Sequence, residues 1–128
     1  MPINRRRFER FELPPMYSSI RIRPLWSERY THEGHAYDVS EGGVRFETDD
    51  AIAPGTPVAI ELLLPRAPGE SDDERERKVY AFGNIIWVND EDIPGPTRMA
   101  AVFTRFVRAG DRERLMSQLV ANRYRRAA

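Results

Sequence analysis

Residues 38–43 read Asp38-Val39-Ser40-Glu41-Gly42-Gly43, and our expectation for the fold starts from these six residues. An ionised aspartate accepts two hydrogen bonds side by side, and a serine hydroxyl both donates and accepts. A pair of glycines lets the backbone turn sharply and lets a ligand approach it closely. We therefore predict a binding turn here, with Asp38, Ser40, Gly42 and Gly43 as candidate contact residues.

A second stretch, nearer the N-terminus, is rich in arginine and reads Arg5-Arg6-Arg7-Phe8-Glu9-Arg10. Each guanidinium is a planar fork of donors that fits phosphate oxygens and the O6/N7 edge of guanine, and its face can stack on a purine. Alone, this stretch is typical of a solvated terminal arm, and the polar turn alone is ordinary turn chemistry. Together they favour a site for a small anion, with Arg5, Arg6, Arg7 and Arg10 as further candidate contacts.

The two stretches, in this order, resemble the signature of PilZ domains. R-x-x-x-R falls on Arg6 and Arg10, and [D/N]-x-S-x-x-G falls on Asp38, Ser40 and Gly43. Residues 54–56, 62–65, 81–87 and 99–103 are similar to the remaining strands of the family. The resemblance implies a mainly β fold, a six-stranded antiparallel PilZ-type β-barrel with a C-terminal α-helix. It also implies a receptor for the bacterial second messenger cyclic di-GMP.

The length and composition fit one domain. At 128 residues the chain can build a single core, and we divide it into a flexible basic arm at residues 1–13 and a barrel with its helix at 14–128. Cysteine is absent, no apolar run is long enough for a membrane span, and residues 1–10 are polar, so we expect a cytoplasmic protein.

Charge is balanced overall but unevenly placed. Twenty basic side chains match twenty acidic ones, yet residues 1–30 carry seven Arg against three Glu, and residues 108–128 carry six Arg against two acidic residues. Basic ends beside an acidic middle favour a local anion site over a broad basic face for nucleic acid. We therefore expect no nucleic-acid partner.

Period-two alternation predicts the strands. Ile20 and Ile22 alternate with Arg21 and Arg23, as in a half-buried strand. The expected strands cover residues 17–26, 35–39, 44–47, 58–64, 79–88 and 98–106, with a polar turn at 27–34. Strands joined by turns, without helices between them, favour an antiparallel barrel or sandwich. Trp26 and Trp87, which have apolar neighbours, are expected to pack in its core.

The C-terminal segment has helical periodicity. Asp111 is a suitable N-cap, and the apolar stripe consists of Leu115, Met116, Leu119, Val120 and Tyr124. This stripe would pack on a barrel opening or on a partner subunit, which leaves room for a homodimer.

Catalytic and metal chemistries find little support in the sequence. His32 and His35 are three positions apart in a glycine-containing turn, whereas the helical zinc motif needs a spacing of four. Ser40 lacks the pattern of a nucleophile elbow, and the acidic clusters lack calcium-loop spacing. We expect neither an enzyme nor a cofactor.

The resemblance also implies residue roles and a switch. Arg6 and Arg10 would contact phosphate and the Hoogsteen edge of guanine, Asp38 and Ser40 would take the opposite edge, and Gly43 would allow close approach. Arg5 implies two ligand molecules per chain, and Glu9 departs from the proline common in the family. The arm would close over the ligand and present a changed surface to an unidentified protein effector.

Two other functions remain open at this point. The chain could be a PilZ-like adaptor that binds a protein without nucleotide, through the helix stripe and the arm. It could also be a small barrel that binds single-stranded nucleic acid through Trp26, Trp87 and the arginines.

Overall fold

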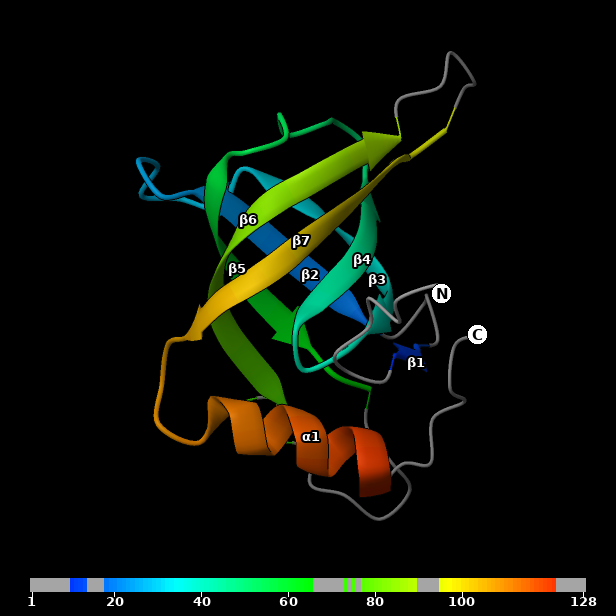
Figure 1. Cartoon of the computed structure of the whole chain (residues 1–128), viewed down its shortest axis with the longest axis vertical. Helices are drawn as coiled ribbons and strands as arrows, with labels where there is room; N and C mark the ends of the chain where they lie inside the picture. The colour runs from blue at the N-terminus through cyan, green and yellow to red at the C-terminus, as the bar shows by residue number, and fades with distance from the viewer. Residues whose placement is uncertain are drawn as a thin grey trace, which may run out of the picture.

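The structure is a computed structural model, and it describes residues 10–13, 18–65, 73, 75, 77–89 and 95–121. Within these residues seven strands are followed by one helix (Figure 1). The elements are β1 Phe11–Glu12, β2 Ser19–Pro24, β3 His32–Val39, β4 Gly43–Thr48, β5 Pro57–Leu63, β6 Lys78–Asn89, β7 Thr97–Phe106 and α1 Asp111–Ala121.

Six of the described strands close into a barrel. Around it they run β3-β2-β5-β6-β7-β4, every pairing is antiparallel, and β4 pairs back with β3. The remaining strand, β1, pairs with the last two residues of β3, beyond the half of β3 that pairs with β2. The predicted six-stranded antiparallel barrel with a C-terminal helix is therefore confirmed, and β1 is an addition to it.

The alternation predicted from sequence sets which side chains enter the barrel. On β2, Ile20 and Ile22 are buried in the core while Arg21 is exposed on the outer face. On β5 both faces are buried, because Glu61 on the outer side is covered by ion pairs with Arg21 and Lys78. A barrel filled by side chains in this way positions its surface turns rigidly.

Helix α1 covers one end of the barrel, below the strand ends in Figure 1. Its Leu115 and Leu119 are fully buried in the hydrophobic core, and Met116 packs against it. Of the two places expected for the stripe, the structure therefore shows the barrel opening. The side chain of Val120 and all of Tyr124 lie outside the described residues.

Strand β3 begins earlier than predicted, at His32 instead of residue 35. Glu33 and Gly34 were assigned to a turn because they are polar or small. In the barrel Glu33 faces outward and pairs with Arg21, Nε to Oε1, at 3.3 Å. Gly34 lies so close to the backbone of Glu47 that any Cβ would overlap the Glu47 carbonyl.

The two tryptophans do not pack in the core, so that expectation was wrong. Trp26 is 74% exposed in the turn that follows β2. Trp87 is half-buried and lies on the outer face of β6. Apolar neighbours in sequence could not predict this, because the bends and bulges of the strands decide which face a residue occupies.

Candidate functional site

The arginine stretch and the polar turn meet through β1. Phe11 pairs with Val39 and Glu12 with Asp38, so Arg10, one residue before β1, lies level with the start of the turn. Burial of Phe11 and of Leu13 holds this pairing against the barrel. Arg5, Arg6 and Arg7 lie outside the described residues. The end of one motif is thus brought beside the other.

The polar turn is held by its own hydrogen bonds. The backbone N–H of Ser40 donates to the carbonyl of Gly43 at 2.9 Å, and the N–H of Gly42 donates to the Ser40 hydroxyl at 3.1 Å. The N–H of Phe103 on β7 donates to the Gly42 carbonyl at 2.8 Å. Ser40 therefore shapes the turn with its hydroxyl, which remains able to donate one hydrogen bond.

Gly43 is required by the neighbouring strand. It pairs with Val102 of β7, and a Cβ built on Gly43 would lie only 2.5 Å from the Ala101 carbonyl oxygen. A larger residue would push β4 away from β7. A glycine is needed at position 43 because the backbone of β7 lies so close, and not because of an unusual backbone angle.

Asp38 lies beyond a β-bulge in β3. The pairing of β3 with β4 shifts between Ala36 and Asp38, so Tyr37 is an extra residue on the strand. Such bulges redirect neighbouring side chains. Asp38 is only 7% exposed, and Nη1 of Arg45 lies 3.7 Å from its Oδ2. This distance suits an ion pair that is longer than a direct hydrogen bond.

A row of side chains extends from Asp38 around the outer face. Asp38 is opposite Arg45 on β4, Arg45 is opposite Ala100 on β7, and Ala100 is opposite Trp87 on β6. Arg45 lies over the Trp87 ring, 6.0 Å from its centroid, and Ala100 between them is buried. The row combines a carboxylate, a guanidinium and an aromatic face.

Two buried arginine donors near the polar turn lack acceptors in the part of the chain that the structure describes. They are Nη1 of Arg10 and Nε of Arg45. Buried donors are normally hydrogen-bonded, so each such case calls for an explanation, and an anionic ligand is one. The site can therefore offer a buried carboxylate and two guanidinium groups to one molecule.

Tyr37 reports the electrostatics of this surface. Burial raises the pKa of the Tyr37 phenol above its ordinary value, and the neighbouring Asp38 carboxylate raises it further. Arg98, whose guanidinium lies 5.3 Å from the centre of the Tyr37 ring, and Arg10 act in the opposite direction. Charges of both signs thus surround one phenol.

The model of the PilZ domain family matches residues 4–121. The chain belongs to the PilZ domain family. The matched range includes both stretches that resemble the PilZ signature, residues 6–10 and 38–43.

Solved structures similar to this PilZ domain include three bacterial proteins. The PilZ domain of Escherichia coli YcgR with c-di-GMP has a TM-score of 0.68 and 16% identity, with 94% of this chain and 92% of that chain covered. The Bacillus subtilis inhibitor of motility MotI/DgrA has a TM-score of 0.66 and 17% identity, with 94% and 52% covered. The K. pneumonia MrkH–c-di-GMP complex has a TM-score of 0.66 and 20% identity, with 93% and 52% covered.

These similarities establish a shared fold. The chain spans about half the length of the Bacillus and K. pneumonia proteins. No curated protein matches the sequence.

Sequence reasoning missed Arg45, Tyr37 and the surface position of Trp87. In the sequence Arg45 is merely the polar residue between Val44 and Phe46. Its neighbours depend on the register of β4 with β3 and β7, which no local pattern specifies. The one available signal is the alternation of the strand predicted at residues 44–47, which puts Arg45 on the face opposite to Val44 and Phe46.

Within the described residues no group of three or more His, Asp or Glu side chains could hold a metal ion. None of the described helical segments is long and apolar enough to cross a bilayer.

Proposed function

We propose that this PilZ domain is a receptor for cyclic di-GMP, which binds on the outer face of the barrel between the N-terminal arm and the Asp38–Gly43 turn. One observation carries the proposal: β1 brings Arg10 level with the Ser40 end of the turn, and Nη1 of Arg10 and Nε of Arg45 are buried donors without acceptors among the described residues. The c-di-GMP complexes of YcgR and MrkH, which share the fold, support the same ligand.

Asp38 accounts for guanine selectivity. Guanine presents two adjacent donors, N1–H and N2–H₂, which one carboxylate accepts together, whereas adenine presents an acceptor at N1 that repels it. In the structure Nη1 of Arg45 lies 3.7 Å from the Asp38 carboxylate. Guanine replaces this long contact with shorter bonds, and Arg45 turns its donors to a phosphate.

The arginines and Trp87 complete the site. Arg10 donates to phosphate oxygens or to the O6/N7 edge of guanine, as does Arg6 in the arm. The Trp87 face, already under Arg45, offers a stacking surface for a base. Arg5 and Arg7 add charge for a second ligand molecule, so we propose two molecules per chain.

Ligand binding and arm closure form one event in this proposal. Each hydrogen bond to a charged partner contributes about 1.5–3 kcal/mol, and ordering the chain costs about 1–2 kcal/mol per residue. Roughly four to six such bonds therefore offset the ordering of a short arm. The closed, charge-neutralised surface is what a protein effector would recognise.

Calorimetric titration tests the receptor directly. Wild type is titrated with cyclic di-GMP, cyclic di-AMP, GTP and a short single-stranded oligonucleotide, and the expected result is tight binding of cyclic di-GMP alone, near two molecules per chain. Arg10→Ala and Asp38→Ala should each raise the dissociation constant at least about tenfold, since each removes a charged hydrogen bond.

Matched controls separate the site from net charge. Arg105→Ala and Asp50→Ala change the same charges at exposed positions and should bind as wild type does. If Arg10→Ala and Asp38→Ala bound cyclic di-GMP as tightly as wild type does, the proposed site would be contradicted. A stoichiometry near one would remove the second ligand molecule.

The exposed Trp26 favours nucleic acid as the second candidate function. Oligonucleotide binding with steep salt dependence would establish it instead.

A further inference from the structure

Glu41, in the middle of the polar turn, is bound by an arginine from the other end of the chain. Arg112, in the first turn of α1, donates through Nε to Oε1 of Glu41, and its Nη2 pairs with the same oxygen. The two residues are 71 positions apart in sequence. The Glu41 side chain is only 16% exposed, so the pair is partly shielded from water. It joins the turn directly to the helix.

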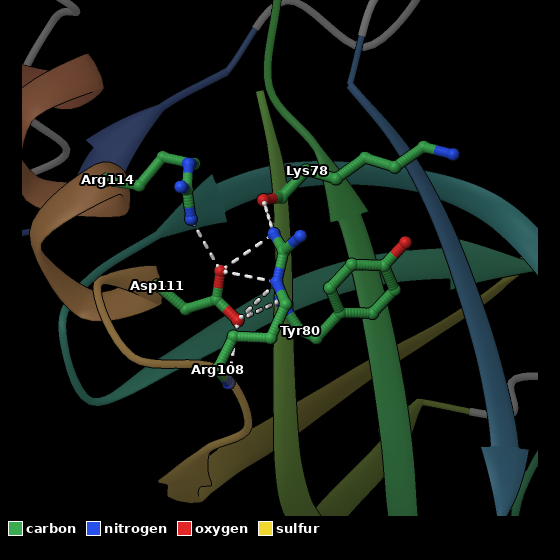
Figure 2. Close-up of polar contacts among 5 residues, drawn as sticks. All are labelled: Lys78, Tyr80, Arg108, Asp111 and Arg114. Atoms are coloured by element: carbon green, nitrogen blue, oxygen red, sulfur yellow. Dashed lines mark hydrogen bonds and ion pairs between the residues drawn. The ribbon is translucent and has the colours of Figure 1, made fainter. Parts of the chain in front are cut away.

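The helix end of this pair is firmly anchored (Figure 2). Asp111, the residue before Arg112, is fully buried and accepts hydrogen bonds from the backbone N–H of Arg108 at 3.0 Å and from Nη1 of Arg114 at 2.8 Å. The Arg108 guanidinium also binds Asp111, donates to the Lys78 carbonyl at 2.8 Å and lies over the Tyr80 ring. The first turn of α1 is thus fixed to β6.

The turn end has a different kind of support. Apart from its internal bonds, the turn is attached to β7 by the hydrogen bond from Phe103 to the Gly42 carbonyl. That bond involves backbone atoms only and belongs to the barrel. The Glu41–Arg112 pair is a side-chain contact, so it can be broken without disturbing the strand pairing.

We propose that the Glu41–Arg112 ion pair couples the polar turn to α1, holding the turn in its ligand-binding conformation and transmitting ligand occupancy to the helix. The inference rests on the proposed cyclic di-GMP site. Glu41 and Arg112 are positioning residues and do not contact the ligand. Coupling must be reciprocal: a contact that favours the binding conformation is itself strengthened when ligand favours that conformation.

A double-mutant cycle on ligand binding tests the coupling. Glutamine preserves side-chain shape while removing charge, so the variants are Glu41→Gln, Arg112→Gln and the double variant. Each single change should raise the dissociation constant for cyclic di-GMP about threefold to fivefold, the range of a partly exposed ion pair. The double variant should bind no more weakly than either single one, because all three lack the same pair. Arg105→Gln, an equal loss of charge at an exposed position of β7, should bind as wild type does.

Hydrogen exchange supplies readouts that a purely structural role would not change. In wild type, cyclic di-GMP should slow exchange of the α1 amides at residues 114–119, and Arg112→Gln should abolish that slowing while ligand still protects the turn. In the ligand-free protein, Arg112→Gln should speed exchange at Gly42 and Gly43.

The outcomes distinguish this inference from the proposed receptor. Two outcomes would overturn the coupling and leave the receptor standing, provided that wild type binds cyclic di-GMP. One is that the effects of the two single substitutions on binding add in the double variant. The other is that Glu41→Gln binds more tightly, as expected if the Glu41 charge only repels the anionic ligand. If wild type does not bind, the receptor fails. In that case, if Arg112→Gln also leaves hydrogen exchange at Gly42 and Gly43 unchanged without ligand, the coupling between the turn and α1 is overturned as well.

Discussion

Gly43 combines a proposed role at the ligand with a demonstrated role in the barrel. A Cβ there would lie 2.5 Å from the Ala101 carbonyl oxygen, which belongs to backbone and cannot rotate away. Gly43→Ala should therefore lower the free energy of unfolding by about 1–3 kcal/mol, as overpacking does. Urea denaturation measures it, with the exposed Ser19→Ala as the control, expected to change stability by less than about 0.5 kcal/mol. Equal stability of the two variants would disprove the steric account.

Tyr37 gives the surface a defined pH dependence. Burial raises the pKa of its phenol above the ordinary value of 10.0, and the Asp38 carboxylate adds to the rise. The folded protein therefore keeps this proton where the unfolded chain has lost it. The corresponding stability is present below about pH 10 and is lost as the pH rises through the folded-state pKa.

The test compares stability with pH in Tyr37→Phe and wild type. Between about pH 9 and pH 11 the free energy of unfolding should fall less steeply in Tyr37→Phe, which has no proton to lose. Tyr30→Phe is the comparison, since burial and then Glu61 raise the pKa of that phenol too. A slope identical to that of wild type in Tyr37→Phe would contradict the raised pKa.

At the scale of elements, α1 depends on its first residue. Asp111 was predicted as an N-cap, which would accept a hydrogen bond from a backbone N–H of the helix's own first turn. In the structure Asp111 is instead the first residue of α1, and its carboxylate accepts from the backbone N–H groups of Tyr80 and Arg108, which precede the helix, and from the side chains of Arg108 and Arg114. The alternation predicted the strands well but missed the start of β3 at His32. The start was missed because an outward-facing polar residue looks the same in a strand and in a turn.

Removing the Asp111 carboxylate should loosen the helix. Asp111→Ala should lower the free energy of unfolding by about 2–3 kcal/mol, below the cost of breaking a fully buried pair because both arginines can reach water. Glu113→Ala removes an exposed carboxylate from the same first turn and should change stability by less than about 0.5 kcal/mol. Circular dichroism during urea denaturation measures both, and similar losses would show that Asp111 is only one of several helix charges.

At the scale of the whole molecule, the arm and the barrel share residues. Residues 1–13 were predicted as a flexible arm, a division that remains a prediction, whereas Phe11 and Leu13 are 6% and 4% exposed in the core. Removing residues 1–9 should abolish cyclic di-GMP binding and leave the thermal midpoint nearly unchanged. Removing residues 1–13 should also cost about 3–6 kcal/mol of stability, because two buried apolar side chains are lost.

Calorimetry and thermal denaturation of the two truncated proteins distinguish these effects. Undiminished ligand binding without residues 1–9 would contradict the role of the arm. Equal midpoints for the two truncations would mean that β1 adds nothing to the barrel.

The sequence alone determined the periodic features of this protein. Alternation specified the six barrel strands, helical spacing specified α1 and its buried leucines, and two motifs identified the family, because each of these depends on residues that are near one another in the chain. The contacts between distant segments depend on the three-dimensional packing. Strand register and two β-bulges set Arg45 between Asp38 and Trp87, and barrel closure brought Arg112 to Glu41. Such contacts join distant segments, and their geometry is fixed by the packing of the whole barrel, so no local pattern encodes it.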